Sequence, residues 1–298
     1  MMAEGIGFQC LICSNSEFEH VFSCTDHFVS KEKFNIIQCT NCGFRLTKDF
    51  PIGKNIDAYY EADDYISHSD TNEGFVNKLY HFVREFMLKE KALWVEKNTK
   101  ASGTELMDVG CGTGYFAALM QKRGWNVVGI EKNDSARDFA KDQFEVNVFP
   151  SLESYTENDK FDAITLWHVL EHLEDLNGSM QKFHELLAHD GSLFVAVPNR
   201  NSSDADKYRQ FWAAYDVPRH LWHFAPEHLK LLAHKHGFEV FETKPFHFDG
   251  FYISLMSEKY KGTSLPFFKG FLSGMKTLFA SWQNKEKSSS LLYILRKK

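Results

Sequence analysis

The sequence predicts an α/β protein with a doubly wound, mostly parallel sheet of seven strands, preceded by a small cysteine-bearing unit. From Thr104 onward, short apolar segments alternate with helical patterns, which is typical of such a sheet. Five of the six cysteines lie before residue 45, which sets the N-terminal part apart. The expected strands are 105–109, 126–131, 146–149, 161–167, 191–197, 238–243 and 291–296.

These segments divide the chain into three parts. Residues 1–50 should form the cysteine-bearing unit and residues 51–103 a connector and helical cap. Residues 104–298 should form the sheet domain, with insertions at 200–226 and 246–290 on its ligand side.

Composition narrows the class of protein. The chain has 298 residues, a net charge of −6 and a pI near 6.2. This balance argues against a nucleic-acid partner, because phosphate binding needs a concentrated basic face. The N-terminus has no signal-peptide pattern and no long uncharged apolar run appears, which predicts a cytoplasmic location. Peripheral membrane contact and the oligomeric state are left open.

The most informative segment runs from Glu105 to Gly114. It reads as a short apolar strand containing Asp108, followed by glycines at every second position and then a helix. Glycines let the backbone turn tightly and approach a ligand, and the helix start points N–H groups at it. The pattern departs from the G-x-G-x-x-G of dinucleotide loops, and Asp108 would repel a pyrophosphate. The next strand closes on Glu131, where an acid that binds a ribose is expected.

These features resemble the class I S-adenosylmethionine-dependent methyltransferases, which have a Rossmann-like fold. The resemblance implies that S-adenosylmethionine lies across the glycine loop, with its ribose on Glu131 and its amino-acid end near Asp108. Residues 150–153 would flank the adenine, although Pro150-Ser151-Leu152 lacks the acid that often meets its amino group. The predicted cofactor-binding residues are Asp108, Gly110, Cys111, Gly112, Gly114, Glu131, Lys132, Ser151, Leu152, Trp167 and His168.

Four cysteines form two C-x-x-C pairs, Cys10 with Cys13 and Cys39 with Cys42. Two such turns supply four thiolates, which complete a tetrahedral zinc site and leave no open position. The N-terminal unit is therefore expected to be a zinc ribbon with a structural metal. The alternatives are two disulfides or a redox C-x-x-C. Cys24 is expected to be a buried small residue, and Cys111 to fill space beside the cofactor.

The fourth strand ends in Trp167-His168-Val169-Leu170-Glu171-His172, at the edge of the sheet that faces the ligand. The run resembles the E-x-x-E-H segment of ubiquinone-biosynthesis-like and small-RNA 2′-O-methyltransferases, with His168 in place of the first glutamate. In the RNA group this segment and a later histidine hold a divalent metal. A site made by His168, Glu171 and His172 is one reading. The other is that Glu171 and His172 order the loop beneath the methyl donor.

A second histidine cluster follows the fifth strand. His220 and His223 are the predicted catalytic residues, because histidine is the usual general base near neutral pH. Either could instead satisfy a loop carbonyl. Arg219 could anchor an anionic group of the acceptor.

The whole pattern resembles bacterial methyltransferases with an N-terminal zinc-binding region, a group that includes deoxysugar C-methyltransferases. The resemblance implies a methyl acceptor that is a small molecule, such as a nucleotide-linked sugar or glycan precursor. It places Tyr59, Tyr60, Tyr65 and His68 near the acceptor. The alternatives are a quinone, lipid or RNA methyltransferase, and a cofactor-binding scaffold without turnover.

Two helices with apolar stripes are expected outside the sheet. One spans 73–98, and the other spans 267–282 with lysines between its apolar residues. The second stripe should pack on its own domain, although such a stripe can also bind a membrane interface, a subunit or an acyl chain. A solvated loop is expected at 284–290. The first stripe consists of Phe75, Leu79, Phe82, Phe86 and Leu93.

Overall fold

The computed structural model describes residues 9–60, 75–100, 103–157 and 159–298, with the backbone alone for Lys54 and residues 75–83. Tyr65 and His68, which the sequence places near the acceptor, lie outside these ranges. The side chains of Phe75, Leu79 and Phe82 do so as well.

The main sheet contains all seven expected strands, in the order β10-β11-β8-β7-β4-β5-β6. The strands from β8 to β6 pair in parallel, and β11 lies antiparallel between β8 and β10. The strand order reverses at β4, where ligands bind in sheets of this kind. The strands are β4 (Glu105–Val109), β5 (Asn126–Ile130), β6 (Asn147–Phe149), β7 (Phe161–Trp167), β8 (Leu187–Pro198), β10 (Phe238–Pro245) and β11 (Ser290–Lys297).

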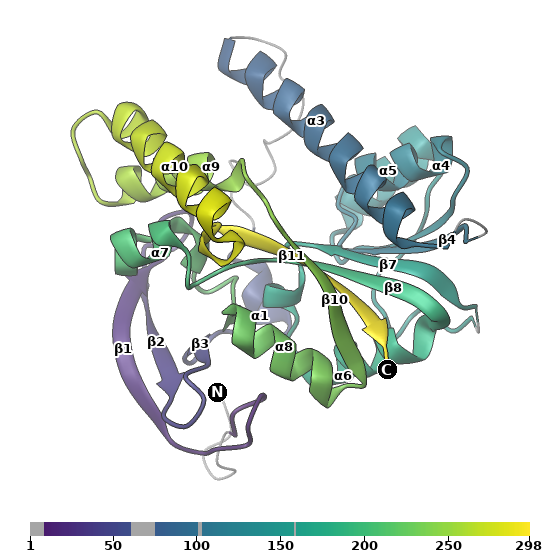
Figure 1. Ribbon diagram of the computed structural model, residues 1–298, viewed down its shortest axis with the longest axis horizontal. Helices are drawn as coiled ribbons and strands as arrows, with labels where there is room; N and C mark the ends of the chain where they lie inside the picture. The colour runs from purple at the N-terminus through teal and green to yellow at the C-terminus, as the bar shows by residue number, and fades with distance from the viewer. Residues whose placement is uncertain (1–8, 61–74, 101–102, 158) are drawn as a thin grey trace.

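Helices cover both faces of this sheet (Figure 1). α3, α4 and α5 lie over one face, and α6 and α8 lie over the other. The hairpin of α9 and α10 extends beyond the end of the sheet formed by β10 and β11. The helices are α1 (Lys54–Asp57), α3 (Phe75–Asn98), α4 (Tyr115–Lys122), α5 (Asp134–Phe144), α6 (Leu176–Leu186), α7 (Ser203–Tyr208), α8 (Pro226–Lys235), α9 (Asp249–Tyr260) and α10 (Pro266–Gln283).

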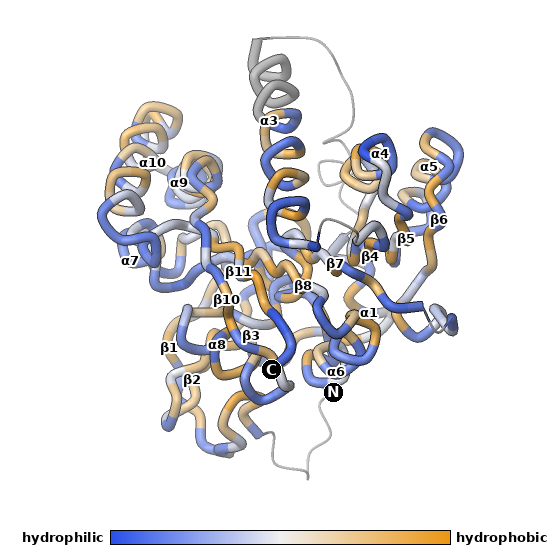
Figure 2. Tube along the Cα trace, turned by 45° about the vertical axis from the view of Figure 1, so that its right-hand side comes forward, coloured by the Kyte–Doolittle hydropathy of each residue, from blue (hydrophilic) through white to orange (hydrophobic). Residues whose placement is uncertain are grey.

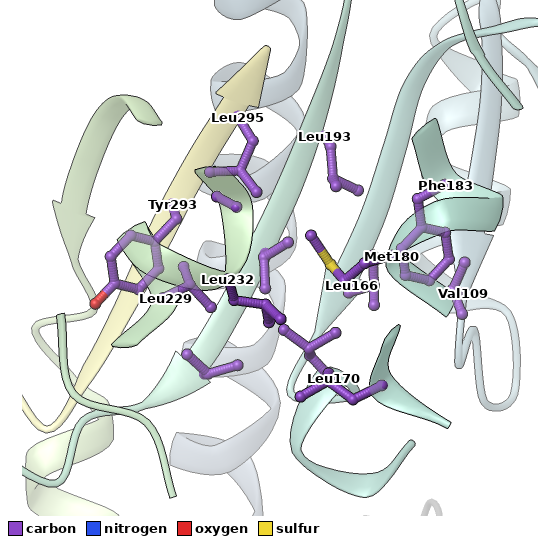
Figure 3. Packing of buried hydrophobic residues seen from close by; sticks show 14 of the residues in the cluster. Val109, Leu166, Leu170, Met180, Phe183, Leu193, Leu229, Leu232, Tyr293 and Leu295 are labelled. Carbon is purple, nitrogen blue, oxygen red and sulfur yellow. The ribbon is translucent and has the colours of Figure 1, made fainter. Parts of the chain in front are cut away.

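The central strands bury side chains on both faces. On β8, Leu193 and Val195 belong to the core that includes α6 and α8, whereas Phe194 belongs to the core that includes α3 and α4. Figure 3 shows the first of these cores, where Phe183 of α6 and Leu229 of α8 lie among strand residues. Strands buried on both faces read as continuous apolar runs. The sequence therefore reveals them without an alternating pattern.

A second sheet forms the N-terminal unit. β1 (Phe18–Thr25), β2 (Lys33–Cys39) and β3 (Arg45–Thr47) pair antiparallel in chain order. The fourth strand, β9 (Trp222–His223), pairs with β3 but comes from the insertion at 200–226. The N-terminal unit is therefore completed by a strand from the sheet domain.

The described residues of the two outer stripes are mostly exposed. On α3, Phe86 and Leu93 are exposed, while Ala92 and Val95 are buried. On α10, most of the large apolar residues are exposed, Met275 and Leu278 are half-buried, and the small residues are buried. The expectation that the whole stripe packs on its own domain is therefore wrong. Among the described helices, none is long and apolar enough to cross a bilayer.

The segment expected to be a solvated loop at 284–290 is solvated only in its first half. Ser288, Ser289 and Ser290 are buried, and the Ser289 hydroxyl donates to Asp204 Oδ2 at 2.8 Å. Serine content alone did not reveal this because the hydroxyls find partners far away in the sequence.

Candidate functional site

The glycine loop connects β4 to α4. Gly110, Gly112 and Gly114 have φ angles of 68°, 54° and 80°, in the left-handed region that side chains rarely adopt. A Cβ at Gly110 would lie 2.4 Å from Val169 Cγ2, and one at Gly114 would lie 2.8 Å from Ala140 Cβ. At Gly112 such an atom would meet nothing within 4 Å among the described residues. The loop is therefore packed at both ends and open in the middle, where a ligand can approach the backbone.

Two carboxylates border this loop. Glu131 accepts hydrogen bonds from the backbone N–H groups of Gly112 and Asn133, both at 2.9 Å. Asp108 is buried and its Oδ1 accepts from the Thr165 hydroxyl at 2.7 Å. Burial raises the pKa of Asp108 to about 7, although the Thr165 hydrogen bond opposes this shift. A cationic ligand beside Asp108 would favour its ionised form.

Trp167 and Cys111 pack beside the loop. The Trp167 ring meets Phe116 edge to face, and its buried Nε1 has no hydrogen-bond partner among the described residues. A Cβ at Gly129 would lie 2.7 Å from Cys111 Sγ, so this thiol fills the space beside β5. Burial also raises the pKa of the Cys111 thiol, which keeps it neutral.

The remaining predicted cofactor residues have partners of their own. Ser151 and Ser154 exchange hydrogen bonds in a turn after β6, and Leu152 is buried there. The Lys132 ammonium lies 2.6 Å from Asp57 Oδ1 on an exposed surface. Their roles in cofactor binding stay predictions.

A cluster of three acid–base side chains lies next to the loop. Glu171 and His172 form the helical turn after β7, where Val169 packs on Gly110, and His220 comes from the insertion at 200–226. Their ligand atoms all lie within 4.8 Å of one another. Glu171 is fully buried, and neither carboxylate oxygen has a hydrogen-bond partner among the described residues. A buried carboxylate without donors is costly unless a cation or proton balances it.

Backbone carbonyls fix the tautomer of both histidines. His172 Nδ1 lies 3.0 Å from the Arg219 carbonyl oxygen, and His220 Nδ1 lies 2.8 Å from that of Ala214. A carbonyl only accepts, so each Nδ1 carries the proton and each Nε2 keeps a lone pair. Burial, aided by the neighbouring His220, lowers the pKa of His172 to about 4. The cluster can therefore accept a proton or hold a divalent cation.

His168 lies at the edge of this cluster. Its Nε2 is 3.1 Å from Asp249 Oδ2 at the start of α9, and its Nδ1 is 3.6 Å from Glu171 Oε1. Burial opposes protonation, but the hydrogen bond with Asp249 and the nearby Glu171 carboxylate raise the pKa of His168 to about 9. A protonated His168 is a poor metal ligand. The described cluster contains His220 in place of His168, which differs from the set of His168, Glu171 and His172 that was one of the two readings of the sequence.

His223 was predicted to be catalytic together with His220, but the structure places it elsewhere. It lies in β9, is buried, and its Nε2 is 3.0 Å from the Thr47 hydroxyl of β3. Burial holds its pKa well below the ordinary range. This position makes His223 part of the N-terminal sheet and favours a packing role, so its catalytic role stays a prediction.

Arg219 does not offer its guanidinium to a ligand either. It is almost fully buried, and its Nη2 lies 2.6 Å from Asp216 Oδ1 and 3.1 Å from Asp26 Oδ1. Its Nη1 donates to the Tyr59 carbonyl. Arg219 therefore ties the histidine loop to β1 and the connector, and the expected role as an anion anchor is wrong.

The four cysteines of the C-x-x-C pairs come together in the N-terminal unit. Cys10 Sγ lies 3.5 Å from Cys42 Sγ, Cys13 Sγ lies 3.6 Å from Cys39 Sγ, and all four sulfurs lie within 4.8 Å of one another. Tetrahedral zinc with Zn–S bonds of about 2.3 Å would separate its sulfurs by about 3.8 Å. The structure contains no disulfide between these cysteines, and the reading as a redox C-x-x-C stays a prediction. Cys24 is buried among aromatic residues, as expected.

The methyltransferase domain family matches residues 79–243, which is more than half of the chain and includes the glycine loop, both carboxylates and the histidine cluster. The chain belongs to this family.

Curated relatives of this methyltransferase-domain protein match a shorter stretch. The ubiquinone biosynthesis O-methyltransferase of Coxiella burnetii is 28% identical over 163 residues, covering 51% of this chain and 66% of the relative. That of Pseudomonas aeruginosa is 28% identical over 116 residues, which cover 36% of this chain and 50% of the relative. The chain thus spans about half the length of the first curated relatives it matches.

Solved structures share the fold of this methyltransferase-domain protein. The magnesium protoporphyrin IX methyltransferase of Synechocystis with bound SAH has a TM-score of 0.55 and 13% identity, and covers 83% of this chain and 100% of its own. The same enzyme with bound SAM has a TM-score of 0.51, with 82% and 96% covered. At this identity the likeness concerns the fold alone.

Sequence reasoning missed several residues of the site. Asp249, the partner of His168, lies beyond the fifth strand in an insertion without a motif. Tyr60, whose hydroxyl is 3.0 Å from His172 Nδ1, was expected near the acceptor but not as a partner of that histidine. The signal that could have found the cluster is the pairing of Glu171-His172 with one later histidine.

Proposed function

We propose that this methyltransferase-domain protein transfers the methyl group of S-adenosylmethionine to a hydroxyl group of a small-molecule acceptor, with the Glu171–His172–His220 cluster removing the proton. The observation that carries the proposal is the cluster itself. Two imidazoles with fixed tautomers lie beside the buried Glu171 carboxylate, which also faces His168, next to the open glycine loop.

Each residue has a defined part in the proposed reaction. The acceptor O–H gives its proton to Nε2 of His172 or His220, and its oxygen forms a bond to the methyl carbon as the carbon–sulfur bond breaks. S-adenosylhomocysteine is left. Glu171 stabilises the imidazolium, and Glu131 and Asp108 align the methyl donor through its ribose and amino-acid end.

A small hydroxyl acceptor fits the site better than RNA. A weakly acidic hydroxyl needs a neutral base, and the fixed imidazoles supply one. The net charge of −6 disfavours a polyanion. The curated relatives are named as ubiquinone biosynthesis O-methyltransferases, which supports a quinol-like acceptor beside the nucleotide-linked sugars inferred from the sequence.

The first experiment is isothermal titration with S-adenosylmethionine, S-adenosylhomocysteine and NAD. Binding of the first two without NAD supports the cofactor, and Glu131→Gln should weaken that binding by about tenfold or more because it loses a charge-assisted interaction. Methyl transfer is then compared among a nucleotide-linked sugar, a catechol-like quinol and RNA. If NAD binds and S-adenosylmethionine does not, the proposal fails.

The same three side chains could hold a divalent cation, and one assay separates the two readings. Zinc-replete protein is assayed with and without added Mn²⁺ or Mg²⁺. Equal turnover supports proton removal by the histidines. Strict dependence on the added cation supports a metal at the cluster.

We also propose that the four cysteines of the N-terminal unit bind one structural zinc ion. The spacing of the sulfurs supports tetrahedral coordination with no open position. Metal analysis should give one zinc per chain, and Cys39→Ser should lower the zinc content and the melting temperature. Cys24→Ala is the control, because Cys24 is buried outside the tetrad and should leave zinc content unchanged.

A further inference from the structure

In the helical hairpin of α9 and α10, helix α10 buries its small and polar residues and exposes most of its large apolar ones. The buried side of α10 consists of small or hydroxyl-bearing residues, whereas its large apolar residues face outward. Figure 2 shows apolar turns along α10. The buried residues are Gly270, Ser273, Gly274, Thr277 and Ser281. The exposed residues are Phe267, Phe268, Phe271, Leu272, Phe279 and Trp282, here called the α10 apolar face.

Glycines allow the two helices to pack backbone to backbone. A Cβ at Gly270 would lie 2.7 Å from Leu255 Cα, and one at Gly274 would lie 2.9 Å from Phe251 Cα. Glycines four apart in an apolar helix are the spacing that membrane helices use for close approach. The hairpin is thus held together mainly through its small residues, together with the contact between the Phe251 and Phe271 rings, and most of the large side chains of α10 remain exposed.

Helix α8 of the same protein does the opposite. On α8, Leu229 and Leu232 are buried and Leu231 is a single exposed apolar residue. Scattered exposure of this kind is ordinary, but a contiguous face of five large aromatic residues and a leucine is not. Phe268 and Trp282, two turns on either side of the helix centre, are 61% and 63% exposed.

The charged residues of α10 itself are all basic. Lys269 and Lys276 are exposed on α10, and α10 contains no aspartate or glutamate. Lys259 and Lys261 are exposed where the chain leaves α9, and the Lys259 ammonium lies 5.4 Å from the Phe267 ring centroid. A protein partner could complement charges of either sign, whereas an anionic lipid surface requires basic residues. Exposed aromatic side chains with lysines on the same helix and at the end of α9 match the acyl and headgroup layers of an anionic bilayer.

We propose that the α9–α10 hairpin docks in the plane of an anionic lipid surface, with the α10 apolar face among the acyl chains and the lysines at the phosphate level. α10 has 18 residues and would lie along the interface. The described helices include none that could cross the bilayer, which agrees with a surface position. α9 begins at Asp249, the partner of His168, so the docked hairpin is attached directly to the candidate site. The inference does not depend on the proposed reaction.

Vesicle sedimentation of the full chain tests this inference. The probe is phosphatidylcholine vesicles with and without phosphatidylglycerol. The native protein should sediment with the mixed vesicles, and Phe268→Ser with Phe271→Ser and Trp282→Ser should abolish this. Lys269→Glu with Lys276→Glu should weaken binding by at least about fivefold per changed lysine. The matched control is Leu93→Ser with Leu231→Ser, because both leucines are 50% exposed on other helices and should not affect sedimentation.

Three outcomes overturn the proposal. The first is native protein that stays in the supernatant with both kinds of vesicle. The second is native protein that binds both kinds equally. The third is a dimer in analytical ultracentrifugation that the triple variant dissociates, without any vesicle binding, which would make the face a contact between two copies. S-adenosylmethionine titration of each variant shows that the variant is folded and keeps this test separate from the proposed function.

Discussion

His220 and His223 lie three residues apart in one loop, yet their surroundings differ in every respect that matters for chemistry. His220 joins Glu171 and His172 beside the glycine loop, with its Nδ1 proton held by a backbone carbonyl. His223 pairs with β3 and contacts the Thr47 hydroxyl inside the N-terminal sheet. The difference arises because β9 pairs with β3, which directs His223 into the N-terminal sheet. A residue type near a site says little until its hydrogen-bond partners are known.

The largest expected effect on activity follows from removing His220. His220→Ala should lower kcat by about 10²–10⁴, the usual contribution of a positioned general base. Binding of S-adenosylmethionine should change little. His189→Ala is the control, because that histidine is exposed and lies far along the chain from the cluster. A His220→Ala variant with native turnover would contradict the proposed role.

Removing His223 should give the converse result. His223→Ala leaves the Thr47 hydroxyl without this partner and opens a cavity, so the free energy of unfolding should fall by about 1–3 kcal/mol. The kcat of the folded fraction should stay near that of the native protein. Urea denaturation and a steady-state assay below the transition measure the two quantities. A large loss of kcat with native stability would restore His223 as a catalytic candidate.

The pH dependence of cofactor binding tests the role of Asp108 beside the glycine loop. Burial raises the pKa of Asp108 to about 7, so below pH 7 this carboxyl is protonated in the free protein. If the ammonium group of the cofactor requires the ionised form, the Kd should rise up to about tenfold per pH unit as the pH falls below 7. Titration calorimetry from pH 5.5 to 8 on the native protein and on Asp108→Asn measures this. The Asn variant should show weaker binding without the slope.

The smallest expected effect is a shift in the acid limb of kcat. His172 has a pKa of about 4, lowered first by burial and then by His220, so it stays neutral above that pH. In His220→Ala the neighbouring imidazole is gone, and the pKa of His172 should rise. The residual kcat of that variant should therefore begin to fall at a higher pH than the native kcat. Identical acid limbs would show that His172 does not titrate in the reaction.

The sequence predicts those features of the molecule that depend on the spacing of residues close together in the chain. The glycine loop, the C-x-x-C pairs and the buried strands depend on local spacing, and the structure confirms the seven strands and the gathering of the four cysteines. The Glu171 cluster depends on a contact between segments nearly fifty residues apart, which no local pattern contains.

The α10 stripe shows a second limit. Periodicity reveals that one side of a helix is apolar, but not which side meets the protein. The glycines at 270 and 274 held that information, because only they permit the close contact with α9. Their spacing was present in the sequence beside the more conspicuous phenylalanines.

Two hydrogen bonds of Thr47 join the N-terminal sheet to the histidine loop, which is synthesised much later than Thr47. The Thr47 hydroxyl donates to the His220 carbonyl oxygen at 2.7 Å, and its N–H donates to that of Leu221. When residue 47 leaves the ribosome, its partner strand has not yet been made. The β3 edge of the N-terminal sheet therefore stays unpaired until the loop that carries His220 has been synthesised and β9 pairs with β3.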